Sequence, residues 1–184
     1  MSENDFELMR RLQSGDRSAV SLLYDRYTPL LYPVLVRILG ERADADDALQ
    51  ETWVQAWRTA PSYDLNRGTV AAWLLTIART RALDRVRSAA SRRRNEGLVE
   101  GEPPINLPDD PSAASEHRQL SERVRRALGA LEPKHRRVLE CAYFDGLSQA
   151  EIATRLNAPL GTVKSWTRQA LTRLKELLPS EEWA

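Results

Sequence analysis

Apolar residues recur at intervals of three and four along nearly the whole chain, and this spacing limits the fold more than any other feature. The clearest stripe covers residues 19–38, and others follow over 48–57 and 70–78. Because a helix turns once every 3.6 residues, such spacing gathers apolar side chains on one face of an amphipathic helix. No segment alternates with the period of two that a half-buried strand requires. The sequence therefore predicts an all-α protein.

The helical pattern breaks down between about Ser88 and Ser115. That stretch is poor in apolar residues and contains four prolines and a run of acidic residues. Such a composition buries too little apolar surface to offset the entropy lost on ordering, so it predicts a flexible linker. We therefore expect two small helical modules, residues 1–90 and 116–180, joined by a linker over 91–115.

Several residues predict where the helices of the first module begin and end. Pro29 and Pro33 lie inside the 19–38 stripe and should kink or divide that helix, because each removes a backbone donor. Asp44 is expected to begin the next helix and Pro61 to end it. A further helix is expected from about residue 69.

Charged residues are segregated along the chain, although 27 Lys and Arg nearly balance 26 Asp and Glu. Residues 79–94 contain seven arginines and one aspartate, and residues 95–122 contain one arginine and seven acidic residues. Residues 123–178 are basic again, with 11 basic and 5 acidic side chains. Clustered positive charge favours contact with nucleic-acid phosphates, so the two basic blocks are candidate DNA surfaces.

The sequence gives little support to a membrane protein or an enzyme. Its longest apolar stretch is about seven residues, against the ~18–20 that span a bilayer, and its acidic N-terminus does not resemble a signal peptide. We expect a cytoplasmic protein without membrane insertion. Cys141 is expected to be a small buried side chain, and His117 and His135 are expected to be surface residues. These residues predict no catalytic site, metal or other cofactor.

The most informative motif lies near the C-terminus. Residues 148–151, Ser-Gln-Ala-Glu, form a capping box that begins a short helix, and a longer helix starts near Leu160 after a break at 157–159. This is the helix-turn-helix pattern, whose second helix enters the DNA major groove. The side chains it would present are Lys164, Ser165, Arg168 and Gln169. Lysine and arginine reach guanine acceptors or phosphates and glutamine pairs with adenine, although a helical hairpin with a solvated basic face remains an alternative.

Two further groups of residues suggest binding surfaces in the first module. Arginines at 79, 81, 85 and 87 follow Trp73, and basic groups beside aromatics suit melted DNA; the alternative is a solvated face with the tryptophan in the core. Asp47, Gln50 and Glu51 share a helix with two tryptophans, at 53 and 57. We expect those tryptophans in the core, which leaves the three polar residues for a partner protein.

Five segments, taken in order, resemble one protein family. They are DALQETW at 47–53, WLLTIAR at 73–79, LEP at 131–133, GLSQAEIA at 146–153 and GTVKS at 161–165. Together they resemble a bacterial RNA polymerase sigma factor of the extracytoplasmic-function type, over nearly the whole chain outside the linker. The resemblance implies a first module that binds core RNA polymerase and opens promoter DNA at the −10 element, a second that reads the −35 element, and control by an anti-sigma factor.

The resemblance also implies roles for individual residues. Asp47, Gln50 and Glu51 match the segment that grips the coiled coil of the polymerase largest subunit. The loop that receives a base flipped out of the −10 strand is matched by Asn66, Arg67, Gly68 and Thr69, and the helix beside it by Arg79, Arg81 and Arg85. Lys164, Ser165, Arg168 and Gln169 occupy the exposed positions of the recognition helix.

The sequence departs from the family pattern at Thr80, Trp166 and Gln169, where many relatives have asparagine, arginine and arginine. Since a good base contact is worth ~1–3 kcal/mol, such exchanges affect which promoter is read. The main alternative is a stand-alone helix-turn-helix regulator. That alternative explains residues 118–178 but gives no role to 47–57 or to the basic helix at 79–87.

Overall fold

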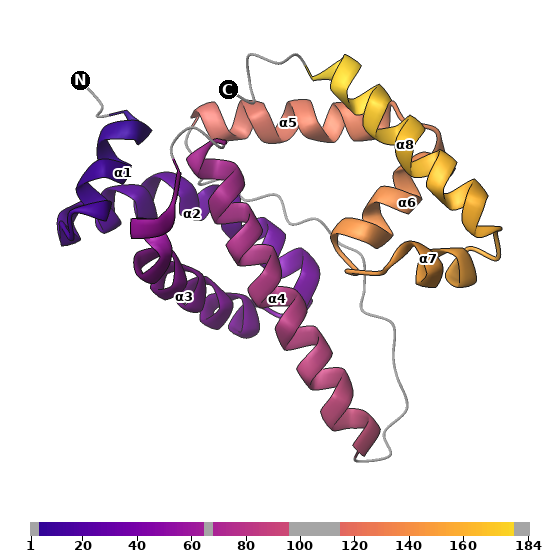
Figure 1. The fold of residues 1–184 in the computed structure, drawn as a ribbon, viewed down its shortest axis with the longest axis horizontal. Helices are drawn as coiled ribbons and strands as arrows, with labels where there is room; N and C mark the ends of the chain where they lie inside the picture. Colours follow the sequence, from indigo (N-terminus) through magenta and orange to yellow (C-terminus); the bar gives the residue numbers. More distant parts are fainter. Residues whose placement is uncertain (1–3, 65–67, 96–114, 179–184) are drawn as a thin grey trace. The chain divides into compact units, whose positions relative to one another are not determined.

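All regular secondary structure in the described part of the chain is helical. The structure, a computed structural model, describes residues 4–64, 68–95 and 115–178 (Figure 1). Over those ranges the regular elements are eight α-helices and one 3-10 turn, with no strand. The chain divides into two units, Met1–Ala114 and Ser115–Ala184. The predicted all-α class and the two helical modules are confirmed.

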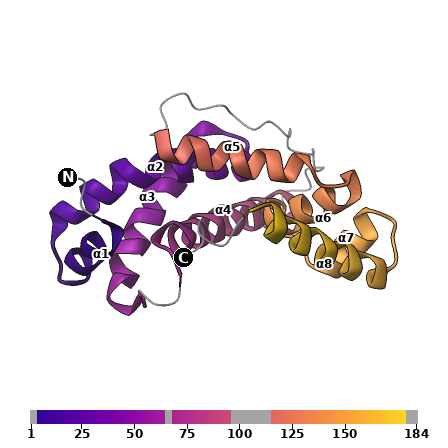
Figure 2. The same cartoon turned by 90° about the horizontal axis from the view of Figure 1, so that it is seen from above.

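Unit 1 is built around helix α2 (Arg17–Leu39), which packs against the other three α-helices of the unit. Besides α2, the unit contains α1 (Asp5–Gln13), α3 (Arg42–Thr59), the 3-10 turn η1 (Ala60–Ser62) and α4 (Val70–Asn95). Helix α2 packs against α3 and α4, which also pack against each other, and α1 lies on α2 and η1 (Figure 1 and Figure 2). The largest side chains that are fully buried in this unit are Leu8, Met9, Leu23, Tyr27, Leu31, Leu35 and Leu74.

Helix α2 starts and stops where the sequence suggests but is not divided by its prolines. Asp16 caps its first turn by accepting from the Ser18 amide at 2.9 Å, and Gly40 ends it with a left-handed φ of 80°. Pro29 and Pro33 lie within one continuous helix, so of the two expected effects, a kink or a division, the division does not occur. The buried face of α2 continues past both prolines, and its packing on α3 and α4 offsets the lost backbone bonds.

Two predicted boundaries are also displaced. Helix α3 begins at Arg42, with Glu41 at the N-cap position, so Asp44 lies in its first turn rather than at its start. Helix α4 continues to Asn95, beyond the boundary expected at residue 90. The residues from 88 to 95 lack apolar side chains for a core but include alanine and arginine, which are good helix formers.

Unit 2 contains α5 (Ser115–Gly129), α6 (Pro133–Tyr143), α7 (Gln149–Arg155) and α8 (Leu160–Leu177). Helix α8 packs against each of the other three. The core is formed by Val138, Cys141, Ile152 and Val163, all fully buried. The predicted burial of Cys141 is confirmed, and desolvation raises the pKa of its thiol.

Nowhere in the ranges 4–64, 68–95 and 115–178 is a helix both long and apolar enough to cross a membrane.

Candidate nucleic-acid and protein interfaces

The turn between α7 and α8 sets the position of the candidate recognition helix. The predicted capping box is present: the Ser148 hydroxyl accepts from the Glu151 amide at 3.3 Å, and the Glu151 carboxylate accepts from the Ser148 amide at 2.7 Å. Asn157 ends the short helix with a φ of 48°, the left-handed conformation that asparagine tolerates better than most residues. This sharp turn starts α8 at Leu160, as the sequence predicts.

The four candidate DNA contacts of α8 lie on one side of the helix. Val163 and Ala170 are fully buried, whereas Lys164, Arg168 and Gln169 are exposed and Ser165 is half-buried. The Gln169 side-chain amide donates to the Ser165 hydroxyl at 3.0 Å, one turn away. The structure therefore brings these four residues together on an accessible face.

Trp166 does not belong to that face. Its ring is half-buried and packs against the core cluster of unit 2. The departure from the family pattern at position 166 is therefore explained by packing, whereas Gln169 remains on the accessible side of α8.

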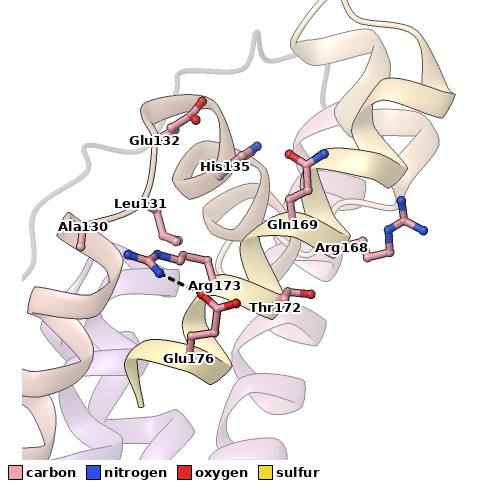
Figure 3. Close-up of a pocket in the computed structure, with 9 residues that line it drawn as sticks. All are labelled: Ala130, Leu131, Glu132, His135, Arg168, Gln169, Thr172, Arg173 and Glu176. Carbon is pink, nitrogen blue, oxygen red and sulfur yellow. Dashed lines mark hydrogen bonds and ion pairs between the residues drawn. The ribbon is translucent and has the colours of Figure 1, made fainter. Parts of the chain in front are cut away.

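A groove of about 500 Å³ adjoins this face (Figure 3). It is lined by the turn before α6, by α6 and by α8, through Ala130, Leu131, Glu132, His135, Arg168, Gln169, Thr172, Arg173 and Glu176. Arg173 and Glu176 are joined at 2.8 Å, and the Arg168 side chain extends away from the turn before α6 (Figure 3). Two of the four candidate DNA contacts, Arg168 and Gln169, thus border the groove.

The expectation that His135 is a surface residue is wrong. Its side chain is 8% exposed, and its Nε2 atom has no hydrogen-bond partner within the described residues. Helix α6 packs against α8, and Val138, three residues after His135, is fully buried. The basic neighbours Lys134 and Arg136 suggested that this segment is exposed to solvent. The spacing of three residues between His135 and Val138, which places both on one face of the helix, indicated burial instead. The side chain of His117 lies outside the described residues, and so its expectation is untested.

Helix α3 presents the candidate protein-binding residues outward. Asp47, Gln50 and Glu51 are all exposed. On the other side of α3, Trp53 is 7% exposed and its ring lies 5.4 Å from that of Tyr24, centroid to centroid. The interpretation of Trp53 as a core residue is confirmed, and Trp57 is half-buried.

Two candidate DNA-binding arginines of α4 contact this same helix. The Arg81 guanidinium donates to the Gln55 side chain at 3.0 Å, and the Arg85 guanidinium donates to the Glu51 carboxylate at 2.7 Å. Arg81 and Arg85 are one turn apart on α4, and Gln55 and Glu51 are one turn apart on α3. The two contacts between the helices therefore lie side by side. Residues that the sequence assigned to different partners are therefore bonded to each other.

Arg85 interacts with a cluster of three carboxylates. Besides Glu51, its guanidinium lies 3.5 Å from the Asp47 carboxylate and 3.8 Å from that of Asp44. The bond from Arg85 lowers the pKa of Glu51, and the same bond raises the pKa of Arg85. We call Arg85 and these three acids the α3–α4 charge cluster. Its arginine neutralises part of an otherwise acidic face.

The segment assigned to base capture is only partly described. Asn66 and Arg67 lie outside the described residues, so nothing tests their predicted roles. Gly68 has a φ of 147°, which favours glycine, and the Thr69 hydroxyl accepts from the backbone amide of Ala72 at 3.2 Å. Arg79, on the helix that follows, is half-buried.

Sequence reasoning missed two residues beside this segment. The Tyr63 hydroxyl donates to the Gly68 carbonyl at 2.6 Å, and its ring lies 4.8 Å from that of Trp73, centroid to centroid. The side chain of Gln13 donates to the carbonyls of both Ala60 and Tyr63. Neither residue belongs to a periodic stripe or a charge run, so the sequence carried no signal for them.

Comparison with known families divides the chain in the same way. Residues 23–92 match the family described as Sigma-70 region 2, and residues 127–176 match Sigma-70, region 4. The first match covers most of α2, all of α3 and most of α4, and the second covers α6, α7 and nearly all of α8. Helix α1 lies before the first match.

Curated relatives match over almost the whole chain. The ECF RNA polymerase sigma factor SigK of Mycobacterium sp. (strain JLS) is 36% identical over 93% of this chain and 89% of its own length. SigK of Mycobacterium tuberculosis (strain ATCC 25177 / H37Ra) is 34% identical over 93% of this chain and 91% of its own. The chain belongs to the ECF sigma factors of RNA polymerase. The predicted resemblance is thus confirmed, and a stand-alone regulator is excluded.

Solved structures similar to this sigma factor include SigE of Rhodobacter sphaeroides, in a complex with the anti-sigma ChrR. SigE is 29% identical, with a TM-score of 0.45 and coverage of 93% of this chain and 96% of that one. RpoE of Bartonella quintana, in a complex with the anti-sigma factor NepR, is 23% identical, with a TM-score of 0.43 and coverage of 85% and 93%.

Proposed function

We propose that this sigma factor divides its work between its two units. Unit 1 binds core RNA polymerase through Asp47, Gln50 and Glu51 and captures an unpaired base of the −10 element with residues 66–69. Unit 2 inserts α8 into the major groove of the −35 element. The observation that carries this division is the α8 surface, where Lys164 and Arg168 lie exposed one turn apart, opposite the buried Val163 and Ala170. The activity consists of binding and needs no catalytic group or cofactor of its own.

The candidate contacts on α8 are of two chemical kinds, cationic and neutral. Lys164 and Arg168 are cations that reach guanine acceptors or phosphates, and Gln169 can donate to and accept from adenine. The bond between Gln169 and Ser165 is between neutral groups, so exchanging it for a base contact costs little. These side chains therefore determine which −35 sequence is read.

The arginines of α4 fall into two groups. Arg81 is held by a neutral amide, and so a phosphate can replace its partner at small cost. Arg85 is held by carboxylates, with which a phosphate would have to compete. We assign Arg79 and Arg81 to contact with the melted DNA, and Arg85 to holding the acidic face of α3 in place for polymerase.

The proposal includes control by an anti-sigma factor. Leu22, Tyr24 and Val54, on α2 and α3, are 45%, 39% and 50% exposed. Exposed apolar side chains beside charged residues are typical of protein interfaces, and an inhibitor that covers α2 and α3 would compete with polymerase. A protein with this function acts in the cytoplasm, where polymerase and the chromosome are.

The charge of the chain favours a factor that works only with polymerase. A net charge of +1 and two small basic surfaces neutralise few phosphates, so DNA affinity without polymerase should be weak and strongly salt dependent. Binding both promoter elements at once requires a scaffold that fixes the distance between the two units.

Run-off transcription tests the proposal. Core polymerase is incubated with and without the protein on sheared DNA from its own genome, and the start sites are mapped. Protein-dependent starts that share upstream −10 and −35 elements are expected. A lack of such starts, together with specific retention of DNA by the protein alone, would contradict the proposal.

Variants then test the division between the units. Lys164→Ala and Arg168→Ala should weaken promoter-directed initiation and leave core binding intact, while Arg173→Ala, which removes a cation bonded to Glu176 on the same helix, serves as the control. Charge reversal at Asp47 should weaken core binding. If Lys164→Ala or Arg168→Ala abolished core binding, the assignment of unit 2 to DNA would be wrong.

A further inference from the structure

Gln13 is the last residue of α1, and its side chain bonds to backbone far along the chain. Its Nε2 donates to the carbonyl of Ala60 at 3.0 Å and to that of Tyr63 at 2.8 Å. A side-chain amide has two N–H donors, so the two bonds use both of them. Ala60 is the first residue of η1 and its carbonyl also accepts from the Tyr63 amide at 3.0 Å, whereas Tyr63 follows directly after η1. Gln13 therefore ties α1 to the chain just after α3.

Tyr63 extends this connection to Gly68, one of the residues assigned to base capture. Its carbonyl is held by Gln13, and its hydroxyl donates to the carbonyl of Gly68 at 2.6 Å. The ring packs on Trp73 of α4 at 4.8 Å and 37°. Gly68 has a φ of 147°, so its backbone conformation is one that other residues rarely adopt. Gln13, Tyr63 and Gly68 thus form a chain of contacts from α1 to the start of α4.

Helix α1, which carries Gln13, is itself held in place by packing and by polar contacts to α2. Leu8 and Met9 are fully buried and Leu12 is 4% exposed, so the apolar side of α1 is packed into unit 1. Near its other end, the Asp5 carboxylate accepts from the Tyr27 hydroxyl and the Arg26 guanidinium of α2. A shift of Gln13 alone is therefore opposed by contacts along the whole of α1.

We propose that Gln13 is a positioning residue for promoter opening. Through Tyr63 it fixes Gly68 and Thr69 in the geometry that receives the unpaired −10 base. Capture of an extruded base requires a preformed pocket, because a loosely held one loses both rate and discrimination. The inference rests on the proposed function, and it gives α1, which lies before the region 2 match, a role in promoter recognition.

The test compares three variants of the full chain in complex with core polymerase. Gln13→Glu keeps the shape of the side chain but removes both donors and sets carboxylate oxygens against two carbonyls. Gln13→Lys restores a donor. Ser21→Glu adds the same negative charge at an exposed position of α2 and is the matched control. Promoter opening is followed by permanganate reactivity, and base preference by substituting the captured base of a promoter found by run-off mapping.

We expect Gln13→Glu to open the promoter about tenfold more slowly, as the loss of two hydrogen bonds suggests, and to discriminate less between bases at the captured position. Core affinity should change less than about twofold. Gln13→Lys should recover most of the rate, and Ser21→Glu should behave as wild type. Base preference is the decisive measurement, because a smaller fraction of folded protein lowers the rate without changing a ratio between templates.

Two results would overturn the inference. One is wild-type opening and wild-type base preference in Gln13→Glu. The other is slower opening with unchanged base preference and a parallel loss of core binding, which would show that Gln13 only stabilises the fold. If the wild-type protein itself opened no promoter with core polymerase, the proposed function would fail first, and this inference with it.

Discussion

Removing Arg85 should expose how strongly α3 and α4 depend on the α3–α4 charge cluster. The guanidinium lies 2.7 Å from the Glu51 carboxylate, 3.5 Å from Asp47 and 3.8 Å from Asp44. The Arg85 side chain is 28% exposed and that of Glu51 is 47% exposed, so solvent screens the interaction in part. Arg85→Ala removes the only cation of this cluster and leaves three acids near one another on α3.

The expected loss is about 1–2 kcal/mol in the free energy of unfolding. A partly exposed ion pair contributes about 0.2–1 kcal/mol, and the close contact to Glu51 places this one near the upper end. Without Arg85, the acids three and four residues apart on α3 repel by about 0.2–0.5 kcal/mol per pair. For a unit of this size the midpoint of thermal unfolding should fall by about 5–10 °C.

A double-mutant cycle with Glu51→Gln isolates the pair. We expect a coupling free energy of about 0.5–1 kcal/mol between Arg85→Ala and Glu51→Gln at low salt. This coupling should decrease at 1 M salt, because salt screens the charges. Because the folded protein holds the pKa of Glu51 below its unfolded value, the coupling should be present at neutral pH and be lost as pH falls through the folded pKa. Arg87→Ala, whose pair with Asp84 is more exposed, is the control. A coupling of zero at low salt would refute the reasoning.

Three further predictions concern the fold. Hydrogen bonds from Ser18 and Arg11 lower the pKa of the Asp16 carboxyl to about 2. The stabilisation of α2 by this carboxylate should therefore persist above pH 4 and be lost as pH falls toward 2. NMR titration measures the pKa, and Asp16→Asn should remove this pH dependence of stability. Cys141, whose pKa is raised by burial, should react with a thiol reagent far more slowly in native than in denatured protein. Ile152→Ala should cost unit 2 about 2–5 kcal/mol, measured by calorimetry.

Features that depend on local spacing could be predicted from the sequence. The stripe over 19–38 became α2, and the 148–151 capping box gave the start of α7. The exposure of positions 164 and 168 followed from the apolar spacing of Val163 and Ala170, since a helix repeats every 3.6 residues. In each case the determining residues lie within a few turns of one another.

Features that depend on contacts between distant segments could not be predicted. Arg85 and Glu51 are 34 residues apart in the chain, and Gln13 and Tyr63 are 50 apart. No periodicity links such residues, and the same arginine fits a DNA contact or an ion pair equally well until the neighbouring helix is in place. The prediction that His135 lies at the surface was wrong for a related reason, because the burial of this side chain depends on the packing of α6 against α8.

The pairing of Arg85 with Glu51 also determines how a loss of transcription in Arg85→Ala should be read. If Arg85 acts on DNA, Glu51→Gln should free it, so that promoter opening by the assembled polymerase is kept or increased even as core binding weakens. If Arg85 acts through the acidic face of α3, Arg85→Ala and Glu51→Gln should share one defect, in core binding, and the double variant should be no worse than either alone. The same ion pair thus predicts opposite results for the two roles, and the structure, with Arg85 held among three carboxylates, favours the second.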